Sequence, residues 1–288
     1  QRLAPVLLLG GLVLLLLVAI PGIGTRVQGA RRWLILPGFS FQPAELMKLI
    51  QVIYLASWLK DRRVSLGHFL AYIGVVGGLI MLEPDMGTTL VITTLSVAIY
   101  FLAGYELSNL LIIGASGLVA ALIAILAAPY RLARVTTFLD PSKDPLGTSY
   151  HIRQVILALG SGGIVGLGIG QSKQKYEYLP ESTTDSIFAV VGEELGFIGA
   201  IILILVFAYL VYLIFRVASR ARSPFSSLLA AGVGSWFALQ VVLNLAAMVA
   251  LTPLTGIPLP LVSYGGSALV TMLIGIGLVL GVAREERL

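Results

Sequence analysis

The chain has 288 residues, of which 58% are hydrophobic and only 11% are charged. A soluble domain carries about 25% charged residues, so this composition excludes a soluble globular protein. The mean hydropathy of +0.97 indicates an integral membrane protein instead. The chain has no cysteine, which excludes thiol chemistry, and its two histidines, His68 and His151, are too few for a His-rich metal centre.

Apolar segments of membrane-spanning length occupy most of the sequence. They are too long and too little alternated to be barrel strands, so we predict helices. The eight predicted spans cover roughly residues 3–21, 43–59, 66–82, 86–103, 107–128, 187–215, 225–251 and 263–283. The sequence therefore predicts an all-α, polytopic membrane helix bundle that forms a single domain over residues 1–288.

The short loops set the expected orientation. Basic residues at 60–63, 216–222 and 284–287 fall on one side under this count, and the positive-inside rule makes that side cytoplasmic. The polar insert 129–184 is then a large extracytoplasmic loop. Because the chain starts at Gln1 without Met, we expect its natural N-terminus to lie upstream.

The outward side is also rich in cations. Its basic residues are Arg26, Arg31, Arg32, Arg131, Arg134, Lys143, Arg153, Lys173 and Lys175. Arg and Lys are the usual partners of phosphate, so these residues predict a phosphate-bearing ligand.

The second span begins with an unusual pair of charges. Pro43 suits the first helical position, and Glu45 there answers the positive end of the helix dipole. This capping role explains Glu45, but Lys48 lies one turn inside the membrane and needs a partner or an aqueous cavity. Function and capping are about equally supported here. Trp33, upstream, has the alternative role of an interfacial anchor.

The polar insert ends in an acid, Asp185, at the start of the next span. Asp185 is a good helix cap, which is one interpretation. The other is a general base, because Glu181 lies four residues away and Lys173 just upstream, and a partly desolvated carboxylate near another acid has a raised pKa. Glu193 and Glu194 enter the span and are expected to pair internally.

Two glycine- or proline-rich segments have structural and functional interpretations. The glycines of residues 158–173 match neither the P-loop nor the dinucleotide fingerprint, and helix packing is favoured over a diphosphate cradle. Residues 252–267, which include Ser263, contain three prolines that forbid a regular helix. This segment is either a structural plug or the wall of a wet cavity.

Several ordered motifs resemble those of one family. They are Gly29 to Trp33, Gln42 to Glu45, Glu83 to Thr88, Phe138 to Pro141, Tyr178 to Asp185, Gly192 to Gly196, and Pro258 to Ser267. Together they resemble the SEDS family of bacterial cell-wall proteins (FtsW, RodA and SpoVE), and most of all its FtsW members. Family members have ten spanning helices, so the resemblance implies that the first two are absent here. Thr183 and Ser186 depart from the family, which commonly has His and Phe there.

The resemblance implies a peptidoglycan glycosyltransferase that polymerises lipid II, with Asp185 as general base and undecaprenyl diphosphate as leaving group. It places the family's functional Trp, Glu and cationic residue at Trp33, Glu45 and Lys48. The candidate substrate-binding residues are Arg32, Trp33, Glu45, Lys48, Lys173, Glu181 and Ser263. The alternative is a lipid II flippase that makes no bond, and a third class is a scaffold that recruits a transpeptidase.

The resemblance also implies partners and a location. We expect lipid II, glycan linked to undecaprenyl diphosphate, a class B penicillin-binding protein, other division or elongation proteins and membrane lipids as partners, and no nucleic acid. The expected location is the bacterial inner membrane, with the active site facing the periplasm or cell exterior. A divalent cation, Mg²⁺ or Mn²⁺, is a candidate cofactor without a nameable ligand set.

Overall fold

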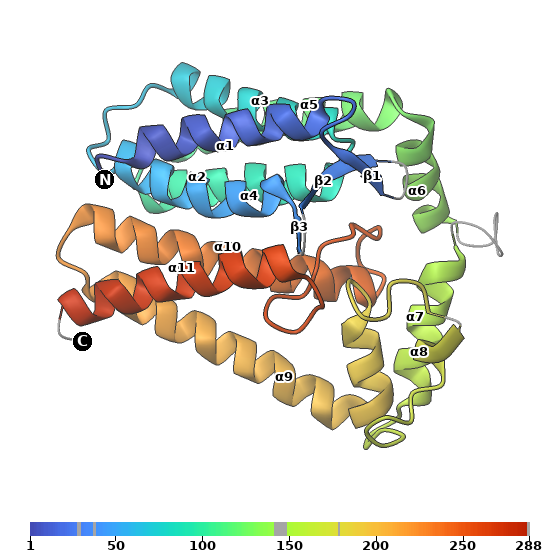
Figure 1. Ribbon diagram of the computed structural model, residues 1–288. Coiled ribbons are helices and arrows are strands. Elements are labelled where there is room, and N and C mark those ends of the chain that lie inside the picture. The colour runs from blue at the N-terminus through green and yellow to red at the C-terminus, as the bar shows by residue number, and fades with distance from the viewer. Residues whose placement is uncertain (28–29, 37–38, 141–148, 178, 287–288) are drawn as a thin grey trace. The chain divides into compact units, whose positions relative to one another are not determined.

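The computed structural model describes residues 1–27, 30–36, 39–140, 149–177 and 179–286, and the statements below concern these residues (Figure 1). Outside these ranges lie Gln28, the motif residues Gly29, Pro141 and Tyr178, and the basic residue Lys143. The helices are α1 (Ala4–Ala19), α2 (Pro43–Leu59), α3 (Leu66–Leu82), α4 (Met86–Leu102), α5 (Leu107–Leu126), α6 (Pro129–Leu139), α7 (Tyr150–Ser161), α8 (Gln174–Glu177), α9 (Ile187–Arg220), α10 (Pro224–Met248) and α11 (Gly266–Glu285).

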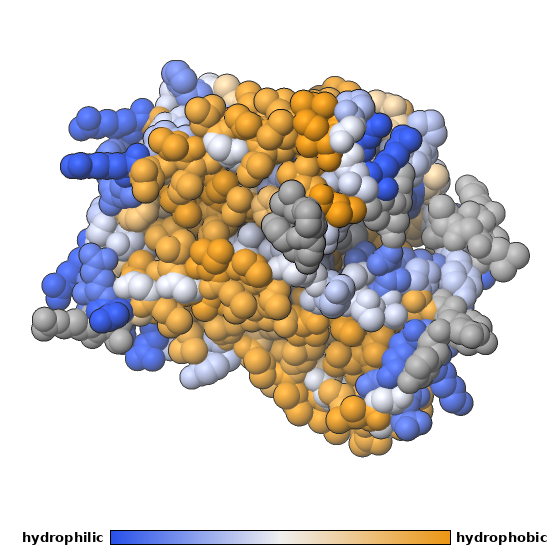
Figure 2. Space-filling model, viewed as in Figure 1, coloured by the Kyte–Doolittle hydropathy of each residue, from blue (hydrophilic) through white to orange (hydrophobic). Residues whose placement is uncertain are grey.

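Each of the eight predicted spans contains a helix. Four of these helices, α5, α9, α10 and α11, are long and apolar enough to cross a membrane by length and composition. Three shorter apolar helices are α1, α3 and α4. Hydrophobic side chains cover the visible lengths of α1 and α9 (Figure 2). Such faces are stable in lipid rather than in water.

The chain divides into two compact units, which we describe separately. The first unit comprises Gln1–Ile113, Leu210–Leu239 and Gly265–Leu288. The second comprises Gly114–Tyr209 and Gln240–Tyr264. The single domain predicted over residues 1–288 stays a prediction.

In the first unit, α2 is the central helix. It packs against α1, α4 and α11, and α3 packs against α1 and α4. The contact surfaces of α1, α2, α3 and α4 share a core that comprises Leu15, Ala44, Met47, Ile50, Val76, Ile80 and Ile92. Because α2 is surrounded by protein, the polar groups on its buried faces can be satisfied only by other protein groups.

The outer segment before α2, expected to be a loop, contains a small antiparallel sheet. Its strands are β1 (Thr25–Val27), β2 (Ala30–Leu36) and β3 (Phe39–Phe41), in the order β1-β2-β3. The ladder pairs backbone N–H and C=O groups that a structureless segment would leave for water. Strand β2 contacts α1 and α2, so the sheet places Arg32 and Trp33 close to these helices.

In the second unit, the predicted polar loop 129–184 contains helices α6, α7 and α8. Helix α7 buries Ile152, Val155 and Ala158, which recur every three residues and therefore lie on one helical face. The sequence predicted a large extracytoplasmic loop here and did not identify these helices, because they are short and have mixed polarity.

Helix α9 is broken at Gly196, where φ is 67° and ψ is −168°. The backbone groups released by the break bond to the glycine-rich segment. Phe197 and Ile198 N–H donate to the carbonyls of Gly163 and Ile164, at 2.9 and 3.1 Å. In return, the N–H groups of residues 167 and 168 donate to the carbonyls of residues 193 and 194 at 3.0 and 2.9 Å. Most of the glycine-rich segment is thus a loop that hydrogen-bonds to the backbone of the broken helix, and not the helix-packing surface that the sequence favoured.

Candidate active site

The first cluster of charges lies on α2, in the first unit. Lys48 Nζ is 2.7 Å from Glu45 Oε1, and both side chains are at most 5% exposed. Lys48 Nζ also lies 5.8 Å from the centre of the Trp236 ring. The second carboxylate oxygen of Glu45, Oε2, is buried and has no hydrogen-bond partner among the described residues. The predicted need of Lys48 for a partner is therefore met by Glu45, one helical turn away.

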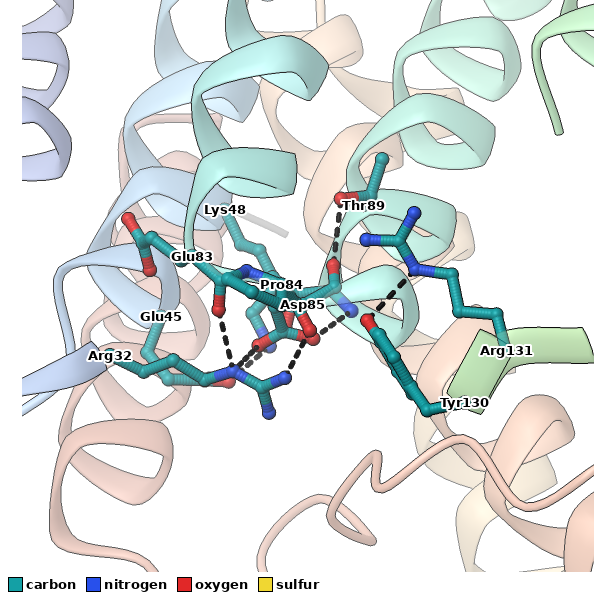
Figure 3. A network of polar contacts seen from close by, with 10 residues as sticks. Arg32, Glu45, Lys48, Glu83, Pro84, Asp85, Thr89, Tyr130 and Arg131 are labelled. Atoms are coloured by element: carbon teal, nitrogen blue, oxygen red, sulfur yellow. Dashed lines mark hydrogen bonds and ion pairs between the residues drawn. The ribbon is translucent and has the colours of Figure 1, made fainter. Parts of the chain in front are cut away.

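A second cation, Arg32, is held from β2 against the turn between α3 and α4 (Figure 3). Its Nε donates to the Glu83 carbonyl at 3.1 Å, and its Nη2 donates to the Pro84 carbonyl. Nε also lies 3.6 Å from Asp85 Oδ2. Arg32 stays 32% exposed at its side chain, so it is a fixed cation that a ligand can still reach.

Asp85 lies in this cluster and also caps helix α4. It is the N-cap, and its Oδ1 and Oδ2 accept from Thr88 N and Thr88 Oγ1, both at 2.9 Å. These bonds fix the carboxylate that faces Arg32. Glu83 and Asp85 were absent from the predicted site. The available signal was the motif Glu83 to Thr88, which contains both acids and lies between two consecutive spans.

Glu83 is a fully buried acid. It is 0% exposed, and neither carboxyl oxygen has a hydrogen-bond partner within the described ranges. Burial raises the pKa of Glu83 to about 8, with Asp85 adding to the rise and Arg32 opposing it. The group is therefore mostly protonated at neutral pH, which removes the cost of a buried charge.

The predicted base, Asp185, lies in the second unit directly before α9 and is half-buried. Burial raises its pKa above the ordinary value. The Thr184 side chain lowers the pKa of Asp185, the charge of Glu181 raises it, and Arg134 lowers it. The direction agrees with the sequence argument, which invoked partial desolvation and Glu181. Glu181 itself is exposed, and its Oε2 accepts from Thr184 Oγ1 at 2.7 Å.

Ser263 contacts the backbone beside Asp185. Its hydroxyl donates to the Thr184 carbonyl at 2.5 Å and accepts from Leu259 N–H at 2.7 Å. The irregular segment 252–264 is thereby tied to the segment that carries Asp185. The hydroxyl of Ser263 is engaged with the protein, and its predicted contact with substrate stays a prediction.

Lys173 lies elsewhere in the second unit. It is exposed, and its backbone N–H donates to Glu193 Oε1 at 3.1 Å. Ser172 Oγ donates to Glu193 Oε2 at 2.6 Å, and Lys175 Nζ is 2.6 Å from Glu194 Oε1. These contacts identify the internal partners that were expected for Glu193 and Glu194.

A histidine that was not among the predicted site residues contacts Ser186, the residue after Asp185. His151 Nε2 is 2.7 Å from Ser186 Oγ, which donates to the Pro180 carbonyl at 3.1 Å. Because the serine proton points to Pro180, the histidine nitrogen is the donor of the first bond. Burial lowers the pKa of His151, while Glu181 raises it and Arg134 lowers it. Ser186, a departure from the family, thus connects His151 to the loop before Asp185.

The predicted residues form two groups. Arg32, Trp33, Glu45 and Lys48 belong to the first unit, where Trp33 is half-buried on β2 and pairs with Thr25. Lys173, Glu181, Asp185 and Ser263 belong to the second. In the part of the chain that the structure describes, no three His, Asp or Glu side chains gather in a way that could hold a metal ion. The divalent cation stays a prediction.

Comparison with known proteins decides the family. The model of the cell cycle proteins FtsW, RodA and SpoVE matches residues 1–288. The chain belongs to this family. It is 41% identical over 281 residues to stage V sporulation protein E of Bacillus subtilis, a match that covers 95% of this chain and 77% of that protein. It is 44% identical over 298 residues to a probable peptidoglycan glycosyltransferase FtsW of Nitrosococcus halophilus, covering 100% of this chain and 76% of the relative.

Solved structures agree with this assignment. A chain solved in a peptidoglycan synthase complex, studied for its coordination of polymerization and crosslinking, superposes with a TM-score of 0.81 at 32% identity, over 99% of this chain and 82% of that chain. The rod shape determining protein RodA of Thermus thermophilus superposes with a TM-score of 0.71 at 32% identity, over 99% and 79%. The predicted family and the polytopic helical membrane fold are therefore confirmed.

Proposed function

We propose that this chain is a peptidoglycan glycosyltransferase that polymerises lipid II at the outer face of the bacterial cytoplasmic membrane. Several relatives at about 40% identity, including those of Nitrosococcus halophilus and Trichlorobacter lovleyi, carry the name probable peptidoglycan glycosyltransferase. The predicted enzyme class is thus confirmed at the level of the family. The lipid II substrate, the catalytic residues and the outward orientation are our proposal.

The observation that carries the mechanism is the half-buried carboxyl of Asp185 at the start of a spanning helix. Its raised pKa makes it a stronger base than an exposed aspartate. In the proposed step, Asp185 takes the proton from the sugar 4-hydroxyl of lipid II. The oxygen attacks the anomeric carbon of the growing strand, and undecaprenyl diphosphate leaves with its bonding electron pair and with inversion.

Cations would stabilise the negative charge that grows on the leaving diphosphate. Arg32 suits this role because hydrogen bonds to two carbonyls fix its guanidinium while a third of the side chain stays accessible. Lys48 is a second candidate, as an ammonium near the start of a spanning helix that is paired with Glu45. Lys173, exposed in the second unit, is the third candidate.

The orientation of the chain in the membrane and its partner protein are inferred from two separate observations. The basic loops at 60–63 and 216–222 indicate the cytoplasmic side, so Asp185 would face the periplasm or cell exterior. One structural neighbour comes from a complex that coordinates polymerization and crosslinking. We therefore infer that this chain works with a crosslinking transpeptidase, a class B penicillin-binding protein.

The test uses the purified protein in detergent, with lipid II and a divalent cation supplied. Asp185→Asn should lower the rate of glycan formation by about 10²–10⁴-fold, the usual contribution of a general base. Asp61→Asn, the same chemical change at an exposed position in a predicted cytoplasmic loop, is the matched control and should keep the rate.

The same assay separates the competing functions. A flippase would leave lipid II unchanged in detergent, where no membrane separates two sides. A scaffold would tolerate Asp185→Asn in a cell-growth assay. Glycan formation at the normal rate by folded Asp185→Asn protein would refute Asp185 as the base.

A further inference from the structure

The backbone that carries Asp185 is held at three consecutive carbonyls. The Thr183 carbonyl accepts from Tyr264 N–H at 2.8 Å. The Thr184 carbonyl accepts from Ser263 Oγ at 2.5 Å, and the Asp185 carbonyl accepts from Asn244 Nδ2 at 2.8 Å. All six residues belong to the second unit. The donors come from the end of α10 and from the irregular segment that follows it.

Asn244 makes two of the contacts that join these parts. Its Nδ2 donates to the Asp185 carbonyl and to the Ile257 carbonyl, each at 2.8 Å, and the residue is 1% exposed. Both partners are carbonyl oxygens, which can only accept, so the nitrogen and not the oxygen of the amide must face them. One side chain on a regular helix thereby fixes the position of Asp185 relative to the loop at Ile257.

The amide oxygen of Asn244 strengthens this interpretation. Oδ1 is buried and has no hydrogen-bond partner within the described residues. A buried acceptor without a partner is unfavourable, so the two hydrogen bonds that Nδ2 donates are the structural reason for an asparagine at this position. The loop that Asn244 holds also borders the carboxylate, since a Cβ added to Gly256 would lie 3.6 Å from Asp185 Oδ2.

We propose that Asn244 is a positioning residue for the reaction: it fixes the Asp185 peptide and the Ile257 loop together, so that the carboxylate is directed to the sugar hydroxyl. This inference rests on the proposed function of Asp185 as base. Small displacements of a catalytic group cost large factors in rate, because a near-attack geometry needs alignment within a fraction of an ångström. Asn244 acts through Asp185 and does not itself contact substrate.

The test compares Asn244→Leu with a matched control in the same unit. Asn244→Leu removes both donors while keeping a side chain of similar size. Thr252→Val removes a hydroxyl, Oγ1, that is buried and unpartnered in the described structure, so it should leave polymerisation unchanged. In detergent with purified lipid II, Asn244→Leu should lower kcat by about 10–100-fold, the scale of a misplaced catalytic group, with KM for lipid II within about twofold.

The pH profile gives a readout that a purely structural role would not move. Loosening the Asp185 peptide should admit water to its carboxylate and weaken the desolvation that holds the pKa up. The acidic limb of kcat should therefore move to lower pH in Asn244→Leu, with Glu181, Arg134 and His151 still present. Full kcat and an unmoved limb in folded Asn244→Leu protein would overturn the proposal.

A second pair of variants covers the case in which Asn244→Leu does not fold. Ser263→Ala removes the bond to the neighbouring Thr184 carbonyl, and Ser263→Thr retains a hydroxyl. If kcat falls in Ser263→Ala and is restored in Ser263→Thr, the result supports the proposal that these hydrogen bonds position Asp185. Equal kcat in both variants overturns it. Activity of Asp185→Asn protein would instead refute the base itself, so the two failures are distinguishable.

Discussion

Lys48 and Glu45 form a buried ion pair on one helix, with 2.7 Å between Nζ and Oε1. Removing one partner of such a pair leaves an uncompensated buried charge. We expect Glu45→Gln or Lys48→Met to destabilise the protein by about 3–5 kcal/mol. The double variant should regain much of this free energy, because neither charge remains.

Thermal unfolding of the single and double variants in one detergent measures the coupling between the two residues. The double variant separates stability from function, since it should fold but lack the cation that we assign to the leaving group. A stable double variant with full lipid II polymerisation would contradict that assignment. Equal stability of the wild type and both single variants would contradict the ion pair.

Glu83 predicts a pH dependence of stability. Its pKa is raised from 4.5 to about 8 in the folded chain, so between these values the native state binds a proton that the unfolded state has released. Stability contributed by this group is therefore fully present below about pH 4.5 and is lost as the pH rises through about 8. Glu83→Gln, which mimics the protonated acid, should remove this slope and be more stable than wild type at pH 8 and above.

Unfolding temperatures measured between pH 5 and 9 test this prediction. Glu106→Gln, at an exposed residue, is the control and should keep the wild-type slope. A Glu83→Gln protein that follows the wild-type curve would mean that Glu83 does not titrate in this window.

The charges around Asp185 predict opposite shifts of the activity profile. A general base works when ionised, so the rate should rise with pH through the pKa of Asp185, above the ordinary aspartate range. Glu181 raises this pKa and Arg134 lowers it. Glu181→Gln should therefore move the acidic limb to lower pH, and Arg134→Gln should move it to higher pH.

Rates of lipid II polymerisation between pH 4.5 and 8 measure the acidic limb of each variant. The two neutral variants serve as controls for each other, because a general loss of fold would lower both rates without moving the limbs in opposite directions. Movement of both limbs in the same direction would argue against Asp185 as the titrating group.

The sequence predicted the parts of the fold that depend on local properties. Long apolar runs gave the eight spans, and the i,i+3 spacing gave the contact between Glu45 and Lys48. Contacts between distant residues were not predictable in this way. Arg32 meets Asp85 only because a small sheet, absent from the prediction, places β2 near the turn at Glu83.

The site around Asp185 shows the same division. Its raised pKa followed from partial burial and from Glu181, four residues away in the chain. The donors that hold its backbone, Asn244 and Ser263, lie far along the sequence, and a buried Asn on a spanning helix indicates a hydrogen bond without naming its partner. Polar residues near the ends of spans signal such contacts but not their pairing.

The break in α9 lies at Gly196, the last residue of the motif Gly192 to Gly196, for which no helix break was predicted. Its φ of 67° lies in the left-handed region, and a Cβ there would be 2.3 Å from Gly166 N. We expect Gly196→Ala to cost about 1–3 kcal/mol or more, from backbone strain and from displacement of the glycine-rich segment. Gly114→Ala is the control, because a Cβ on that glycine of α5 would meet no atom within 4 Å.

Thermal unfolding in detergent compares the two variants with wild type. Gly196→Ala should also weaken the hydrogen bond that Glu193 accepts from Ser172 Oγ, so limited proteolysis between α7 and α9 should become faster. Gly114→Ala should show neither effect. A Gly196→Ala protein as stable and as protease-resistant as wild type would mean that α9 can run straight through this position, and that the glycine-rich segment is not needed to satisfy its backbone.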